Sequence, residues 1–333
     1  MIRAWWYPND GKEPDEVTLD EVSGKIDAAN GLVWIDSDHT DEPALDPLLT
    51  QLGVNEFARE DLVKAGQRTK LAHYTDHFHV AVYDCVLRAD GVHAREIDIV
   101  FGAGWALSIH QAPDNGDPGD FPIDLVRRRF GVQRAQHRAS DVGLLLWSLL
   151  DVVVDRYFVV TETVDDHLDE IEDAILAGTE ATQHEKNKTT MQLFSLGKAL
   201  VRFRRAAVPL RDVTAEIVRR EVPCIDDTAI VHFQDLADHV LRVSDFVESQ
   251  RDVLTGLRDA ELAAASNRLS ESQQRIAAWG AILIVATLIT GVLGMNFRNA
   301  PELDWEIGFL VIAGLMLVLG IPIFFYFKRK DWI

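Results

Sequence analysis

The sequence predicts an α+β domain, then long stalk helices, and finally a hairpin of two membrane-spanning helices at the C-terminus. Residues 1–135 alternate short apolar strands with turns, and residues 136–275 carry long runs of helical periodicity. Two uncharged segments follow at 276–293 and 307–327. Nearly all ionisable residues precede these segments, so a water-exposed body with a C-terminal membrane anchor is the simplest interpretation.

The N-terminal segment, residues 1–135, has the pattern of a mixed α/β domain. Asp90-Gly91 is typical of a hairpin turn, and the breaker-rich run at 113–120 indicates a loop. The segment begins without the long apolar stretch of a secretory signal, so we expect this domain in the cytoplasm. Strands are expected at 31–36, 77–83, 96–101 and 105–109, and short helices at 43–52 and 56–65.

Residues 136–275 are expected to form a helical stalk that includes the cytoplasmic part of the first membrane-spanning helix. One helix is predicted over 141–177, and a second over 184–221 with a bend at Pro209. A third starts at residue 226 and continues without proline towards the membrane. Helices of this length far exceed the globular average, which indicates an elongated stalk.

Each uncharged segment is long enough to cross a membrane. At a rise of 1.5 Å per residue, 276–293 just spans a hydrocarbon core of about 30 Å, and 307–327 spans it fully. The short link at 294–306 makes the pair a hairpin whose two ends face the same side. Arg275 and the basic tail at 328–333 flank the hairpin, whereas the link is mainly acidic. Both termini are therefore expected in the cytoplasm.

The first span carries a regular stripe of residues. Ile276, Gly280, Ile284, Thr287 and Gly291 recur at steps of three or four, so they share one face of a helix. Two interpretations stay open. The stripe is either a small-residue packing face between helices, or a pore wall in which the two isoleucines are constrictions and the threonine is a polar ring. One two-span subunit cannot enclose a path, so a pore requires several copies around an axis.

The first span ends in Gly294-Met295-Asn296, and Pro301-Glu302-Leu303 follows in the link. Together with the two spans, the basic tail and the long helices, this pattern resembles the CorA family of magnesium and divalent-cation transporters. The resemblance covers most of residues 140–333 well and the N-terminal domain loosely. A ring of amide oxygens from the asparagine can hydrogen-bond the water around a magnesium ion without trapping the metal.

The resemblance implies a funnel-shaped homopentamer in a bacterial or archaeal cytoplasmic membrane. Such an assembly admits magnesium, and also cobalt or nickel, down the membrane potential. Gln273 would add an inner polar ring to the pore. Intracellular magnesium gates the family by binding between neighbouring cytoplasmic domains, and Asp235 matches one carboxylate of that site. Its partner from the neighbour would be Asp90 or, as a second choice, Asp84; the alternative for Asp235 is an ordinary solvated helix residue.

The composition excludes several classes of function. A net charge of −20 argues against nucleic-acid partners. The sequence has no phosphate-binding loop and no recognisable paired acid and base, so we expect no nucleotide, no organic cofactor and no enzymatic activity.

The acidic link residues Glu302 and Asp304 would concentrate cations near the outer mouth. His73, His77 and His79 lie close together but lack the remaining ligands of a tetrahedral zinc site.

Two other functions stay open at this point. A ZntB-like zinc transporter shares the architecture, although the Pro-Glu-Leu sequence of the link favours CorA. A membrane-anchored scaffold or sensor would transport nothing. Comparing magnesium with zinc uptake separates the first alternative, and unchanged cation flux in an Asn296→Ala variant would favour the second.

Overall fold

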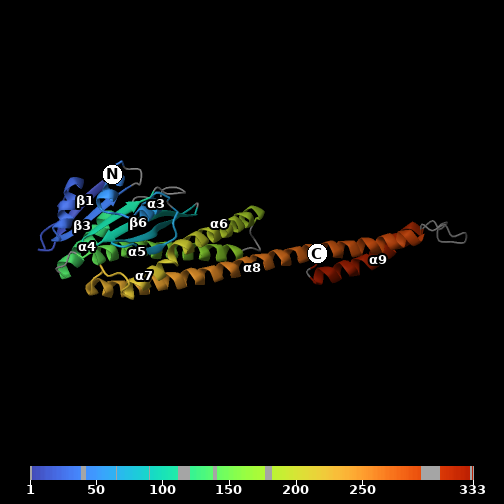
Figure 1. Cartoon of the computed structure of the whole chain (residues 1–333). Coiled ribbons are helices and arrows are strands. Elements are labelled where there is room, and N and C mark those ends of the chain that lie inside the picture. Colours follow the sequence, from blue (N-terminus) through green and yellow to red (C-terminus); the bar gives the residue numbers. More distant parts are fainter. Residues whose placement is uncertain are drawn as a thin grey trace. The chain divides into compact units, whose positions relative to one another are not determined.

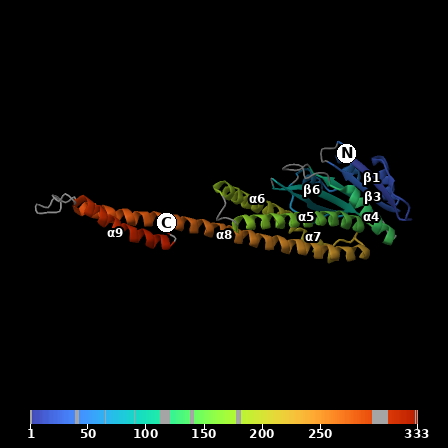
Figure 2. The same cartoon turned by 180° about the vertical axis from the view of Figure 1, so that it is seen from behind.

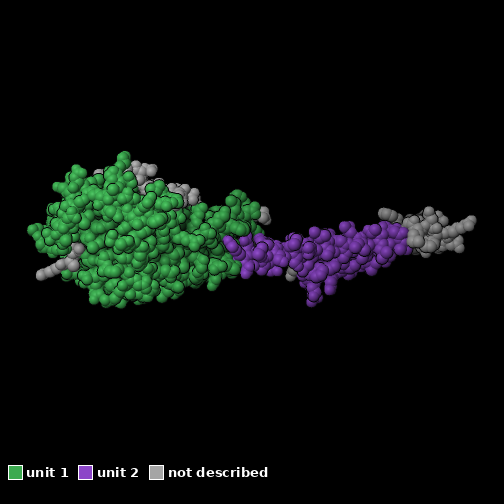
Figure 3. Space-filling model, viewed as in Figure 1, with its two compact units in different colours: residues 1–257 green, residues 258–333 purple. Residues whose placement is uncertain are grey.

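The computed structural model describes residues 2–38, 43–64, 66–89, 91–111, 121–137, 141–176, 182–293, 308–330 and 332. The chain divides into two compact units, residues 1–257 and 258–333, which Figure 3 colours separately. Unit 1 holds the sheet and helices α1–α7, and the long helix α8 (Asp227–Leu293) contributes to both units.

Unit 1 is built on one seven-stranded sheet in the order β2-β1-β3-β7-β6-β5-β4. β3 and β7 pair in parallel, and all other neighbours are antiparallel. The four strands that the sequence predicts are confirmed as β3, β5, β6 and β7, and β5 joins β6 in the predicted hairpin. The strands are β1 (Ile2–Pro8), β2 (Asp15–Glu16), β3 (Gly31–Ser37), β4 (Lys70–His73), β5 (Phe78–Arg88), β6 (Gly91–Gly102) and β7 (Trp105–His110).

The central strands are buried on both faces, because helices cover each side of the sheet. Along β6, Ile99 and Phe101 join one apolar cluster, whereas Val100 between them joins the other. This alternation is the period of two that a strand imposes on its side chains. The smaller cluster includes residues of α2 (Leu45–Gln51) and α3 (Glu56–Lys64), both predicted as short helices, and the larger one includes residues of α4 to α8.

The long helices lie against the larger cluster and largely follow the predicted ranges. The predicted helices over 141–177 and from 226 are confirmed as α5 (Val142–Leu176) and α8. At Pro209 the structure has a full break, not a bend, between α6 (Gln183–Ala207) and α7 (Leu210–Val218), because proline has no amide hydrogen to donate to the preceding turn. The remaining helical elements, which the sequence did not predict, are α4 (Ile123–His137), α1 (Val22–Asp27) and a 3-10 turn at Leu19–Glu21. The sequence did not predict the strands β1, β2 and β4 either.

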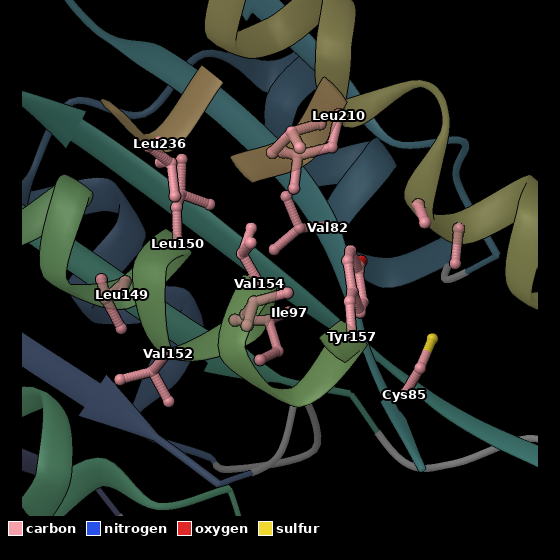
Figure 4. Close-up of a cluster of buried hydrophobic side chains, with 14 of the residues drawn as sticks. Val82, Cys85, Ile97, Leu149, Leu150, Val152, Val154, Tyr157, Leu210 and Leu236 are labelled. Atoms are coloured by element: carbon pink, nitrogen blue, oxygen red, sulfur yellow. The ribbon is translucent and has the colours of Figure 1, made fainter. Parts of the chain in front are cut away.

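Helix α5 forms the centre of this core (Figure 4). Its Leu150, Val154 and Tyr157 are fully buried with Val82 and Ile97 of the sheet. The Tyr157 hydroxyl donates a 2.6 Å hydrogen bond to the carbonyl oxygen of Tyr83, so even its polar atom is satisfied inside the core. Figures 1 and 2 show α5 running along the sheet in both views.

Unit 2 contains the C-terminal part of α8 and helix α9 (Gly308–Arg329). Among the described residues, these are the two helices that are long and apolar enough to cross a membrane, and almost nothing of their apolar stretches is buried. They run side by side in both views (Figures 1 and 2), and the rings of Trp279 and Phe324 lie 6.3 Å apart. The predicted apolar hairpin is therefore present as two packed helices.

Candidate ion pathway and metal sites

The predicted stripe of the first span lies on an open face of α8. Ile276 and Ile284 are 73% and 68% exposed, and Thr287 and Gly291 are exposed as well. Gly280 is half-buried, but a methyl group added there would meet no described atom within 4 Å. No neighbour within the described chain therefore explains why these positions are small or uncharged.

A different stripe of α8 is covered within the subunit. Ala278 is fully buried, while its neighbours along this face are half-buried. At 3.6 residues per turn, this face points almost opposite to the predicted stripe. The covered positions are Ala278, Ala281, Ile282, Val285, Ala286 and Ile289. Packing between α8 and α9 therefore leaves the predicted stripe free for contacts outside the subunit.

The hydroxyl of Thr287 is the polar group at the centre of the open stripe. It donates a 2.8 Å hydrogen bond to the carbonyl oxygen of Leu283, one turn earlier. This bond uses the hydroxyl hydrogen and leaves oxygen lone pairs able to accept from water. Gln273, one turn before the span, is also exposed. The stripe thus offers oxygen acceptors at two levels, separated by apolar side chains.

Several predicted site residues fall outside the described part of the chain. These are the whole Gly-Met-Asn sequence and the acidic residues of the link, together with one predicted regulatory carboxylate. The residues concerned are Gly294, Met295, Asn296, Glu302, Asp304 and Asp90.

Asp84 forms an ion pair inside unit 1. Its side chain is fully buried in β5 and forms an ion pair with Arg156 of α5. Burial raises the pKa of Asp84, and the positive charge of Arg156 opposes that shift. A buried carboxylate paired in this way offers no ligand at the surface of the unit. This placement argues against Asp84 as a ligand shared with a neighbouring subunit.

Asp235 has the opposite environment. Its side chain is 70% exposed on α8, while Phe233 and Leu236 on either side are fully buried. The carboxylate therefore projects away from the core. Its contact with His239 is long, at 3.8 Å between nitrogen and oxygen. Such a carboxylate is available to a cation or to a second copy of the chain.

The three clustered histidines do not form a common site. His73 contacts Glu216, and His77 accepts a 3.3 Å hydrogen bond from the amide of Asn55. His79 is buried against Asp98 at 2.7 Å. Among the described residues, no group of three or more histidine, cysteine, aspartate or glutamate side chains is arranged to hold a metal ion.

Comparison with known proteins now assigns the family. A family model described as CorA-like Mg2+ transporter protein matches residues 29–329. This chain belongs to the CorA family. It is accordingly a membrane transporter of divalent cations, and members of the CorA family move ions without acting as enzymes.

Individual relatives agree with this assignment. The cobalt/magnesium transport protein CorA of Thermotoga maritima is 29% identical over 84% of this chain and 77% of its own length. The complete structure of the CorA magnesium transporter from Methanocaldococcus jannaschii has a TM-score of 0.75 at 21% identity, covering 100% of this chain and 99% of that one. The Methanocaldococcus jannaschii structure confirms that the α+β body, the long helices and the two apolar helices form a CorA fold.

The fold of the body alone does not separate CorA from ZntB proteins. A ZntB cytoplasmic domain from Vibrio parahaemolyticus matches with a TM-score of 0.56 at 13% identity, covering 80% of this chain and 98% of that one. At this identity the likeness concerns the fold of the body only. The choice of ion has to come from the residues of the pathway.

The sequence did not predict one contact between two histidines. His137, at the end of α4, lies against His232 of α8, with 95 residues between them in the sequence. Neither residue belongs to a recognisable spacing motif, so no local signal could have joined them. Burial lowers the pKa of His232, and the neighbouring His137 lowers it further.

Proposed function

We propose that this chain carries magnesium into the cell through a pore lined by the first span of five identical subunits. The observation that carries the proposal is the open stripe of α8, which is uncharged and faces away from α9. Cyclic symmetry would turn each stripe residue into a ring, so Ile276 and Ile284 become apolar constrictions and Thr287 a ring of hydroxyl oxygens.

The chemistry of the stripe fits a hydrated ion. Magnesium loses its water reluctantly, so neutral oxygen acceptors can guide the hydrated ion and release it again. Asn296 at the outer end would select it through amide oxygens, with Gly294 allowing the helix to open and Met295 packing the link. Gln273 and Gly291 would line the two ends of the path, while Glu302 and Asp304 attract cations to the mouth.

The membrane potential supplies enough driving force without a nucleotide. A divalent ion that crosses 100 mV gains about 4.6 kcal/mol, which is twice the value for one charge. The basic tail and Arg275 favour a cytoplasmic location of both termini, and the electrically negative interior then draws cations inward. Cobalt and nickel, which are also divalent, would follow the same path.

Internal magnesium would close the pore by binding between cytoplasmic domains. The exposed Asp235 is the carboxylate that we assign to this site, and Asp90 is the partner that we favour from the neighbouring subunit, since Asp84 is buried. An ion that binds only the closed arrangement stabilises it by mass action. An Asp235→Ala variant should therefore need more internal magnesium to close, and an unchanged dose response would remove this residue from the mechanism.

The experiment that tests the proposed transport is ion flux into liposomes across a panel of magnesium, cobalt, nickel and zinc, with and without internal magnesium. We expect magnesium entry that follows the imposed potential and falls when Asn296 is changed to Ala. Zinc entry without magnesium entry would identify a ZntB-like transporter instead. Flux that is absent, or indifferent to Asn296→Ala, would favour a scaffold or sensor.

A further inference from the structure

Two imidazole rings meet between α4 and α8, within unit 1. The Nε2 atoms of His137 and His232 lie 3.3 Å apart. The ring centroids are 5.4 Å apart, and the rings are almost perpendicular, at 84°. His137 is exposed and His232 is half-buried, so water reaches the pair.

Trp147 of α5 packs against the ring of His232. Its indole is buried and lies with its centroid 4.7 Å from the ring of His232. This contact limits the orientations available to His232 from the side of the core. The Nε2 atom of His232 therefore lies next to the exposed ring of His137.

The spacing of the two nitrogens matches that of two ligands on one metal ion. With each nitrogen about 2.1 Å from a shared ion, a separation of 3.3 Å subtends about 104° at the metal, close to the tetrahedral angle. The same spacing also suits a single hydrogen bond between two neutral rings. The two explanations predict different responses to metal ions and to substitution by glutamine.

We propose that His137 and His232 form a two-histidine site for a transition-metal dication such as nickel, cobalt or zinc, with water completing the coordination. Imidazole nitrogen favours these metals, whereas magnesium prefers oxygen ligands, so the site discriminates against the most abundant cellular dication. No third protein ligand is placed on this pair among the described residues, which makes the site open and exchangeable.

A metal bound at this site would link two helices. A metal bound to both rings ties the last turn of α4 to the beginning of α8, because the two helices supply one ligand each. Asp235 lies about one turn further along α8, so its exposed carboxylate adds favourable negative charge nearby. Transition metals bound at this pair would thus stabilise unit 1.

The test is a nickel titration of the full chain, purified without a polyhistidine tag, by isothermal titration calorimetry. The variants are His137→Gln and His232→Gln, because glutamine keeps a hydrogen-bonding side chain but does not replace an imidazole ligand. The matched control is His184→Gln, which changes an exposed histidine on α6. The loss of an outer-shell partner already costs about 10–100-fold in metal affinity, so the loss of a direct ligand should cost at least as much.

We expect the wild type and His184→Gln to bind nickel equally, and both glutamine variants of the pair to lose the same site. Excess magnesium should not compete. With excess magnesium present to occupy the sites of the proposed pathway, nickel should raise the thermal unfolding midpoint of the wild type and of the control, but not of His137→Gln or His232→Gln. The proposal is overturned if the wild type shows no nickel site, or if either variant of the pair retains wild-type affinity.

Discussion

The change of Gly143 to Ala tests how closely α5 approaches the beginning of α8. A methyl group on Gly143 would lie 2.8 Å from the Cβ of Ala229 and 2.8 Å from the Cγ2 of Ile225. Carbon atoms pack at about 3.5–4.0 Å, so the methyl group overlaps both neighbours by about 1 Å. Ala229 is fully buried and Ile225 is nearly so, and the Cβ of Ala229 cannot move aside without a shift of its backbone.

The magnitude follows from two opposing terms. Overpacking a well-filled core typically costs about 1–3 kcal/mol. The better helix propensity of alanine over glycine returns about 1 kcal/mol. Gly143→Ala should therefore lower the free energy of unfolding by up to about 2 kcal/mol, which corresponds to a fall of several degrees in the unfolding midpoint.

The matched control is Gly131→Ala in α4, where an added methyl group meets no described atom within 4 Å. This variant should gain about 1 kcal/mol from helix propensity alone. Thermal unfolding of the purified full chain, followed by circular dichroism, measures both. Equal midpoints for the two variants would refute the close approach of α5 and α8.

Three further predictions concern charge, the pathway and the buried ion pair. Burial and the nearby Asp98 raise the pKa of Glu96 to about 7. The free energy of unfolding should therefore fall by about 3 kcal/mol as pH rises from about 4.5 to 7. The unfolding midpoint of Glu96→Gln should lack this dependence on pH. Ile284→Ser should increase the leak of cations into liposomes. It should lower the free energy of unfolding by less than about 1 kcal/mol, because the side chain is mostly exposed. A leak equal to that of the wild type would argue against a constriction at this position. Asp84→Ala should cost about 3–5 kcal/mol by leaving Arg156 unpaired, which a normal unfolding midpoint would contradict.

The elements with strong local signals could be predicted from sequence. Helices α5 and α8 have long stretches without proline, and β3 and β7 are short apolar runs bounded by turn residues. Helix α4 was missed because three consecutive arginines mask its pattern. Its buried residues Ile123, Val126 and Phe130 nevertheless recur at helical spacing, so the signal was present in the sequence.

Contacts between distant residues could not be predicted in the same way. His110 and Asp36 are 74 residues apart, yet they share a buried 2.8 Å contact between paired strands. The burial of Asp84 likewise depends on Arg156 of another element. Periodicity shows which face of an element is apolar, but not which polar residue its partner presents. This is why the regulatory carboxylates were harder to predict than the membrane spans.

A cysteine scan along the first span tests the central claim most directly. Single cysteines would be introduced into the full chain after Cys224→Ser, with the buried Cys85 retained, and flux into liposomes would be measured before and after a charged thiol reagent. A pore wall predicts block at positions 276, 280, 284, 287 and 291, and no block at positions 278, 281, 282, 285 and 289. Block on the face covered by α9, or no block at any position, would contradict the account.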